Sequence, residues 1–455
     1  MNETARRLGR DFTTWGLFRF ALPRMGMSLF IMSYMVADGA LISHYLGTNA
    51  LAALNLVWPL SSVLMAFGIM LSAGGASVIA RRLGAGDKEG AERALSSIFI
   101  AEAVLGAVLG LLGWIFLDQL MVFLEIGPDE APYAEAYQHV ALVTMPALLV
   151  NVAAQTFFTT AGFPKVGLAV SIASGVTNVV LDILFMGPMG FGMTGAAWAT
   201  SISWMVCVAC AWYFFRRKNA ALRFSFRVPE WQAVKNAATS GVSEMVAYLS
   251  HAVTLFLFNS AFQKSLGVDG VAALTVAMYA SYVFNAIFYG LSEAVSPVIG
   301  YNYGNRNWPR LKRVLNEAFV LLAVFSLSAY ALSYFFADDV LAAFVDNSPH
   351  VASLVADYFP LYALSLLFTG PNLFAAYLFT AFGDGRRATV VSFSHTFLFV
   401  TGAILVFPKF FGEIGLWLSA PGAEAAAFVL SAFMILANRR RYGYDGREAE
   451  RINVA

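Results

Sequence analysis

The sequence predicts an all-α polytopic membrane protein with twelve transmembrane helices in two six-helix lobes, related by a pseudo-two-fold axis along the membrane normal. Composition, an internal repeat and the placement of basic residues each support this fold class. Of the 455 residues, 59% are hydrophobic and 13% are charged, and the mean hydropathy is +0.67. Soluble domains carry about 25% charged residues, so these values exclude an ordinary soluble chain.

The length of the chain sets the number of membrane crossings. At roughly 20 apolar residues per crossing plus short loops, a chain of this size holds about 12 helices. Charged segments and Gly/Pro-rich turns divide the apolar runs. The helices of the first half are expected at 16–44, 51–80, 94–122, 137–161, 166–187 and 193–215. Those of the second half are expected at 235–263, 271–300, 313–336, 355–381, 388–409 and 414–437.

An internal repeat with an offset of 220 residues divides the chain into two halves. Between 46 and 95, 15 of 50 positions are identical to the residue 220 positions later, whereas shared apolar composition alone would give roughly 4. The offset recurs late in each half, where Gly192 and Gly195 correspond to Gly412 and Gly415. Duplicated halves in apolar chains are typical of transporters.

Basic residues alternate between loops in a way that orients the chain. One side carries Arg6, Arg7, Arg10, Arg81, Arg82, Lys88, Lys165, Arg216, Arg217, Lys218, Arg306, Arg310, Lys312, Arg313, Arg386, Arg387, Arg439, Arg440 and Arg441. Since loops rich in Lys and Arg stay in the cytoplasm, both termini are predicted to be cytoplasmic. An even number of helices per half then gives parallel repeats.

The same reasoning divides the chain into five segments. These are a cytoplasmic N-terminal segment (1–15), an N-terminal lobe (16–215), a cytoplasmic linker (216–234), a C-terminal lobe (235–437) and a cytoplasmic tail (438–455). The scattered basic residues give no nucleic-acid-binding face.

Two acids and two neutral polar residues are expected at one depth in the first lobe. A charge near the bilayer centre costs on the order of 3 kcal/mol, so each one needs a reason. Asp38 lies late in helix 1 and Asp182 late in helix 5, with Asn178 one turn before Asp182 and Thr200 early in helix 6. Oxygen ligands suit a hard cation such as Na⁺, and a carboxyl pair can instead carry a proton. Interhelical hydrogen bonding is the structural alternative.

The second lobe carries a different pair of acids, expected in its cytoplasmic half. Glu244 lies early in helix 7 and Glu293 late in helix 8. Arg24 is the repeat counterpart of Glu244, so we expect the two to pair across the lobe interface, either as a gate or as a structural salt bridge. Glu293 has no obvious basic partner, and an unpaired acid lining a cavity would attract cationic substrates.

Other ionisable residues within helices support weaker expectations. Glu102 is expected to snorkel or to pair with loop arginines, and Glu424 also lies within a helix. For His251 and His395, a hydrogen-bonded packing role and a proton-carrying role both remain open. The sequence has no Walker motif and no cluster of catalytic side chains, so we expect neither ATP-driven transport nor an enzyme.

Paired motifs in the two halves resemble the multidrug and toxic compound extrusion (MATE) transporters. The segments LSAGGASVIARRLGAGDKEGAERAL (71–95) and LSEAVSPVIGYNYGNRNWPRLKRVL (291–315) resemble the family's helix-to-loop signature. LPRMGMSLF (22–30) and GLWLSAPGAEAAAF (415–428) resemble its helix 1 and helix 12 openings, and YGLSEAVSP (289–297) resembles its MepA-like group.

The resemblance implies the positions of a cation site and a substrate site. In the prokaryotic branch an Asp on helix 1 and an Asn-x-x-x-Asp on helix 5 form the cation site, which matches Asp38, Asn178 and Asp182, and Thr200 matches a helix 6 hydroxyl ligand. The helix 8 acid, here Glu293, is implicated in substrate binding. Another branch has a helix 10 Asp, which this chain lacks between 361 and 383.

The resemblance also implies a function and a location. The expected function is export of organic cationic or amphipathic drugs in exchange for Na⁺ or H⁺ by alternating access, by a monomer in a bacterial or archaeal inner membrane, with no cofactor. The alternative is a flippase or an exporter of metabolites or lipid-linked substrates from the same superfamily. That alternative predicts basic residues in the central cleft, and Arg24 is the one base expected at mid-membrane.

Overall fold

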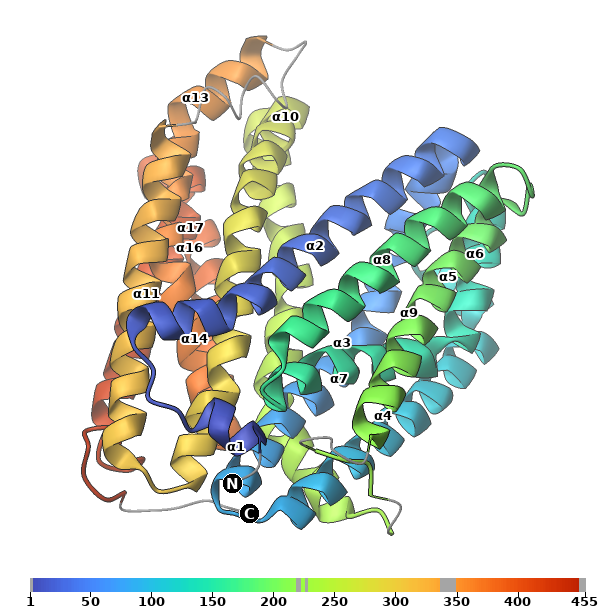
Figure 1. Cartoon of the computed structure of the whole chain (residues 1–455). Coiled ribbons are helices and arrows are strands. Elements are labelled where there is room, and N and C mark those ends of the chain that lie inside the picture. Colours follow the sequence, from blue (N-terminus) through green and yellow to red (C-terminus); the bar gives the residue numbers. More distant parts are fainter. Residues whose placement is uncertain (1–2, 218–221, 226–227, 336–348, 450–455) are drawn as a thin grey trace.

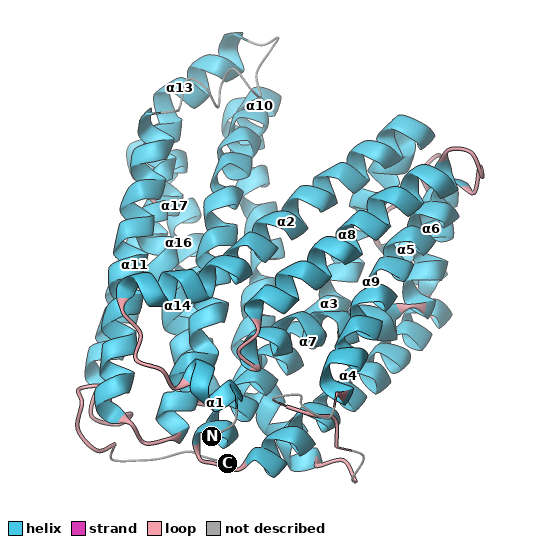
Figure 2. Ribbon diagram, in the orientation of Figure 1, coloured by secondary structure: helices cyan, strands magenta, loops and turns pink. Residues whose placement is uncertain are grey.

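The computed structural model describes residues 3–217, 222–225, 228–335 and 349–449, and within these ranges every regular element is a helix (Figure 2). The first half contains α1 (Glu3–Leu8), α2 (Thr14–Leu46), α3 (Thr48–Gly84), α4 (Lys88–Ile115), α5 (Leu117–Phe123), α6 (Ala131–Val143), α7 (Met145–Thr160), α8 (Pro164–Met186) and α9 (Gly192–Arg216). The second half contains α10 (Trp231–Gly304), α11 (Trp308–Phe335), α13 (Pro349–Ala363), α14 (Leu366–Ala381), α15 (Gly385–Phe393), the π-helix η1 (Ser394–Leu398), α16 (Phe399–Phe411) and α17 (Glu413–Ala437).

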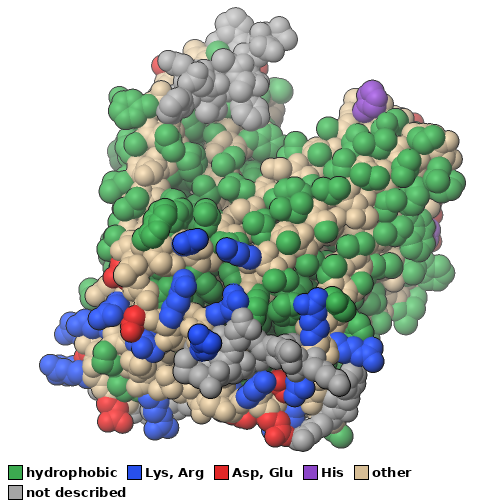
Figure 3. Space-filling view, in the orientation of Figure 1, with side chains coloured by type: hydrophobic (Ala, Val, Ile, Leu, Met, Phe, Trp, Pro, Cys, Tyr) green, Lys and Arg blue, Asp and Glu red, His purple; other side chains and the backbone are tan. Residues whose placement is uncertain are grey.

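The helices form two lobes, α2–α9 and α10–α17, which meet at one end of the molecule and diverge toward the other (Figure 1). We call the end that carries α1 the closed end and the opposite one the open end. The space-filling view shows a notch between the lobes at the open end, and apolar side chains cover the sides of both lobes (Figure 3). The two-lobe fold confirms the predicted fold class.

The helices account for twelve membrane crossings. Nine described helices are long and apolar enough to span a bilayer, and two bent pairs bring the number of spans to 11. The 74-residue α10 contains two of the expected helices, joined at Gly267, whose φ of 67° and ψ of −156° are not helical. Its repeat counterpart Gly47, which separates α2 from α3, also has a positive φ of 87°. Glycine tolerates this conformation because it has no Cβ.

The expectation that 137–161 and 355–381 are single continuous helices is wrong. α6 and α7 meet at a bend of 62°, and α13 and α14 at a bend of 44°. In the first pair Pro146 lies at the start of α7, where its missing N–H group cannot continue the preceding helix. In the second pair the Ser365 N–H donates to the Tyr362 carbonyl in a tighter turn, at 3.0 Å. The bends lie about one repeat apart, so both halves share them.

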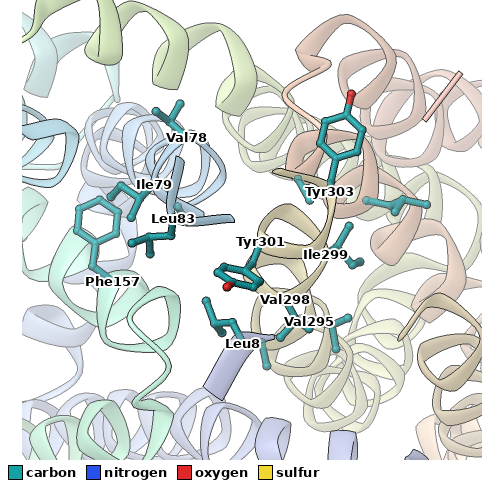
Figure 4. Packing of buried hydrophobic residues seen from close by; sticks show 14 of the residues in the cluster. Leu8, Val78, Ile79, Leu83, Phe157, Val295, Val298, Ile299, Tyr301 and Tyr303 are labelled. Atoms are coloured by element: carbon teal, nitrogen blue, oxygen red, sulfur yellow. The ribbon is translucent and has the colours of Figure 1, made fainter. Parts of the chain in front are cut away.

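Repeat-related apolar residues join the two lobes at the closed end. Val78 and Ile79 of α3 are buried, as are their counterparts Val298 and Ile299 of α10. These side chains belong to one cluster that continues into both lobes, together with Leu83 (Figure 4). Burial of side chains of this size contributes on the order of 1.5–3 kcal/mol each.

Two glycines let the backbones of α3 and α10 touch within this cluster. A Cβ atom on Gly84 would overlap the carbonyl oxygen of Tyr301, and one on Gly304 would overlap the carbonyl oxygen of Arg81. Gly84 and Gly304 are 220 residues apart, as are Arg81 and Tyr301, so the contact repeats itself across the pseudo-two-fold axis. Small residues allow such close helix packing in membranes.

We predict that Gly84→Ala and Gly304→Ala each destabilise the protein. Each added methyl group overlaps a carbonyl oxygen, which costs about 2 kcal/mol or more, so the melting temperature of the purified protein falls by several degrees. Gly402→Ala is the matched control, because a Cβ there meets nothing within 4 Å and alanine favours the helix by about 1 kcal/mol. Equal melting temperatures for all three variants would contradict the tight contact.

Candidate functional site

Three helices of the first lobe bring together the four side chains that the sequence singled out. Asp38 lies on α2, Asn178 and Asp182 on α8, and Thr200 on α9. α8 packs between the other two helices. Its approach to α2 depends on Gly175, because a Cβ there would lie 2.6 Å from the Phe30 ring. The local sequence therefore positions α2 close enough for Asp38 to reach α8.

The two carboxyl groups of this cluster face one another. Asp38 lies within hydrogen-bonding reach of both Asp182 and Asn178. Asp182 is 0% exposed and Asn178 is 1% exposed, while Asp38 is partly exposed. The Asn178 Nδ2 donates to Thr200 Oγ1 at 3.2 Å. The structure therefore places two acids, an amide and a hydroxyl in one buried cluster.

Four carboxyl and amide oxygens of this cluster lack hydrogen-bond donors within the described residues. Within the described part of the chain, both carboxyl oxygens of Asp182 accept no hydrogen bond, and neither does Oδ1 of Asp38 or Oδ1 of Asn178. Buried acceptors are normally satisfied, and two facing carboxylates repel each other unless a proton or a cation lies between them. The arrangement can therefore hold one shared proton or a hard cation such as Na⁺, for which oxygen ligands are suited.

Sequence reasoning missed two tyrosines of this cluster. The Tyr137 hydroxyl interacts with Thr200 and lies near both acids, and Tyr34 lies near Asp38. Tyr34 could have been found, because it precedes Asp38 by one helical turn on the same face. Tyr137 comes from α6, and no spacing in the sequence connects it to the other members.

An ion pair connects the lobes near the closed end, and it corrects two expectations. Arg24 of α2 donates to one carboxyl oxygen of Glu293 on α10, from Nε at 2.8 Å and from Nη2 at 2.5 Å. The expected pairing of Arg24 with Glu244 is wrong, and so is the expectation that Glu293 has no basic partner. The Arg24 Nη1 also donates to the Gln155 carbonyl at 3.2 Å, which turns its guanidinium toward Glu293.

Glu244 has one carboxyl oxygen without a donor in this region. It is 4% exposed, and its Oε1 has no hydrogen-bond partner within the described residues. The Tyr377 hydroxyl of α14 lies within hydrogen-bonding reach of the same carboxyl, and Glu293 is its electrostatic neighbour. A buried carboxyl beside a second acid is the type of group that a cationic ligand would neutralise.

Glu102 does not behave as expected from the sequence. We expected it to snorkel or to pair with loop arginines, but it is 0% exposed. The Ser72 hydroxyl donates to its Oε1 at 2.9 Å. The acid lies nearly four turns into α4, where it packs against α3 rather than reaching the loop. It therefore ties two helices of one lobe together.

The fold and these sites define the class of protein. Two parallel six-helix repeats that meet at one end and enclose buried acids form the architecture of a secondary transporter. A model of the MatE family matches residues 23–184 and 245–405, one match in each lobe, and the chain therefore belongs to the MatE family of multidrug export transporters.

The chain is similar in sequence to multidrug export proteins over nearly its full length. It is 24% identical to the multidrug export protein MepA of Staphylococcus haemolyticus (strain JCSC1435), over 94% of each chain. It is also 22% identical to MepA of Staphylococcus aureus (strain bovine RF122 / ET3-1), over 95% of each chain.

Solved structures share the fold. An outward-facing MATE family transporter of the MOP superfamily superposes with a TM-score of 0.89 at 23% identity, covering 96% of this chain and 99% of its own. A MOP superfamily transporter from Pyrococcus furiosus superposes with a TM-score of 0.89 at 23% identity, covering 97% and 98%.

We predict that Arg24→Met lowers the stability of the protein by about 2 kcal/mol, because it leaves the Glu293 carboxylate, whose side chain is 23% exposed, without its partner. Replacing both partners, as Arg24→Met with Glu293→Leu, recovers most of the loss because no buried charge remains. The measurement is unfolding of the purified variants by heat or denaturant.

The control for this prediction is Lys88→Met, which breaks a pair with Glu92 at 3.4 Å; the Lys88 side chain is 43% exposed, and Arg223 remains 3.9 Å from Glu92. Such pairs contribute about 0.5 kcal/mol or less. An effect of Arg24→Met no larger than that of Lys88→Met would show that the inter-lobe pair is dispensable for stability.

Proposed function

We propose that this protein is a secondary antiporter that exports amphipathic or cationic compounds in exchange for Na⁺ or H⁺. The observation that carries this proposal is the close approach of the Asp38 and Asp182 carboxyls, three of whose oxygens have no hydrogen-bond donor among the described residues. A site of this kind is stable only when a mobile cation or proton occupies it, so its occupancy responds to an ion gradient.

The placement of charge supports an orientation for the antiporter. Lys and Arg side chains gather at the closed end in Figure 3, and basic loops face the cytoplasm. The notch between the lobes then opens to the outside, and α1 and the segment after α17 lie in the cytoplasm. Since Asp38 lies late on α2, the coupling ion reaches the carboxyl pair from the outer side.

One helix links the ion site to the lobe interface. α2 carries both Asp38 and Arg24, which lie about 21 Å apart along it at 1.5 Å per residue. Occupancy of the carboxyl pair changes how α2 packs against α8, and the same helix holds Glu293 of the other lobe through Arg24. Ion binding thus favours one arrangement of the lobes, and substrate binding favours the other.

The charges near the lobe interface support a cationic or amphipathic substrate. The base that an anionic substrate would require, Arg24, is already neutralised by Glu293, which disfavours the alternative of an exporter of anionic or lipid-linked compounds. Glu244 offers an oxygen without a donor. The MepA proteins that this chain resembles are named for multidrug export, which supports the same substrate class.

We predict that Asp38→Asn and Asp182→Asn each abolish drug export while the protein still folds and inserts, because an amide can neither share the proton nor neutralise the cation. Export is measured in proteoliposomes with a Na⁺ gradient and a pH gradient imposed separately. The gradient that drives the native protein identifies the coupling ion.

Asp357→Asn is the control for these variants, because Asp357 is an exposed acid of α13 outside the cluster. It should export at the native rate. Native export by either cluster variant would refute the site, and failure of both gradients to drive the native protein would refute antiport.

We predict that Glu244→Gln raises the KM for cationic drugs about tenfold and leaves the KM for a neutral amphipathic drug nearly unchanged. A tenfold change corresponds to about 1.4 kcal/mol, which is a modest value for the contact of one buried carboxyl with a cation. The measurement is uptake into inverted vesicles across a matched pair of cationic and neutral analogues. Equal effects on both analogues would indicate a structural role for Glu244.

A further inference from the structure

A second buried network of ionisable and polar side chains lies in the C-terminal lobe, apart from the sites described above. His395 of η1 contacts Glu424 of α17, with 3.0 Å between Nδ1 and Oε2. The Asn372 Nδ2 of α14 donates to the same Oε2 at 2.7 Å. His395 is 8% exposed and Asn372 is 0% exposed. Three helices therefore converge on one carboxyl oxygen.

Asn372 is oriented so that only its donors face Glu424. Its Nδ2 also donates to the Glu424 backbone carbonyl at 2.9 Å. Its Oδ1 accepts a hydrogen bond from the Ser431 hydroxyl at 3.0 Å. With the amide oxygen occupied by Ser431, the amide presents only donors to Glu424.

The pair lies near the middle of the membrane. At 1.5 Å per residue, His395 is about 15 Å along the helix that starts at Gly385, and Glu424 is about 17 Å along α17. A hydrocarbon core is about 30 Å thick. His395 lies in the only π-helical turn of the described residues. Such turns are frequently found at functional sites.

The charge balance at this depth favours uptake of a proton. With a neutral imidazole the pair carries one negative charge, and the titratable residues of the described chain that interact with it include His251 and Tyr289 of α10 and Tyr362 of α13. None of these is a lysine or arginine. A lone charge in the membrane interior is costly, whereas an imidazolium paired with the carboxylate has no net charge.

His251 is an exposed titratable group near the pair. It lies on α10 and interacts electrostatically with His395. A proton bound at His251 can pass to the His395 imidazole and be held where Nδ1–H donates to Glu424. No counterpart of this network exists in the first lobe, where the residues 220 positions earlier are Gly175, Trp204 and Val152.

We propose that His395 and Glu424 form a second proton-binding site, in the C-terminal lobe, that takes up one proton through His251 independently of the Asp38–Asp182 pair. Its use in transport rests on the proposed antiport function, but protonation of the pair does not. With this site, each lobe contains one pair of side chains whose negative charge a proton can neutralise. A pH gradient therefore acts on both lobes.

Histidine-selective ¹⁵N NMR of the full chain in nanodiscs tests this site directly. The protein has five histidines, and His395→Asn identifies the His395 signals. We expect the native His395 to become cationic as the pH falls from 9 to 5. In Glu424→Gln the same imidazole stays neutral over this range, because no carboxylate offsets its charge. Asp182→Asn leaves the titration of His395 unchanged, because the two sites are independent.

Further variants replace Glu424→Gln if that variant does not fold, and they test the role of His251. If Glu424→Gln does not fold, Glu424→Asp retracts the carboxylate by one methylene and should reduce the cationic fraction of His395 at a given pH. His251→Asn should slow proton exchange at His395, whereas His139→Asn, in the other lobe, should not. A His395 that stays neutral throughout, or that titrates identically without Glu424, overturns the proposal.

Transport measurements separate this proposal from the general function. If antiport fails in proteoliposomes but His395 titrates as described, the proton site stands and the antiport function falls. If export is driven by a gradient but His395 does not titrate with Glu424, the function stands and this site falls.

Discussion

The backbone contact between α3 and α10 is the constraint on which the rest of the structure depends. Gly84 and Gly304 allow the two helices to touch at the carbonyl groups of Tyr301 and Arg81. Any other residue at these positions would push the two backbones further apart. The lobes are therefore held together at the closed end by a contact that repeats itself across the pseudo-two-fold axis. Divergence at the open end follows, because nothing comparable joins the described helices there (Figure 1).

The symmetry of this contact contrasts with the asymmetry of the charges. At the repeat offset Asp38 and Asp182 correspond to Phe258 and Gly402, and Glu293 corresponds to Ala73. Packing of small and apolar groups can be shared by both halves, because each half needs the same helix spacing. The acids differ between the halves, so the first lobe carries the Asp38–Asp182 pair and the second carries Glu244 and Glu293.

Much of the fold and part of the candidate site could be predicted from the sequence. Apolar runs and the repeat gave the number and order of the helices. The expected direction of each helix set the depth of its residues in the membrane, and this placed Asp38 and Asp182 at the same depth. The bends within two helices were missed, because an apolar run does not show where a helix changes direction. The pairing of Arg24 was also missed. Glu244 and Glu293 share a depth, and only the rotation of α10 decides which one faces α2.

Each buried acid of this protein can be understood through the partner that the fold supplies. Glu293 has a guanidinium, and Glu102 has the Ser72 hydroxyl at one of its oxygens. A basic side chain such as that of Arg24 neutralises a carboxylate in one arrangement of the lobes. When the lobes move apart, the carboxylate needs another partner. Asp38 and Asp182 have each other and the Asn178 amide but no fixed cation, so the charge that neutralises them has to come from solution. An acid pair that lacks a fixed partner is therefore suited to couple an ion gradient to movement of the lobes.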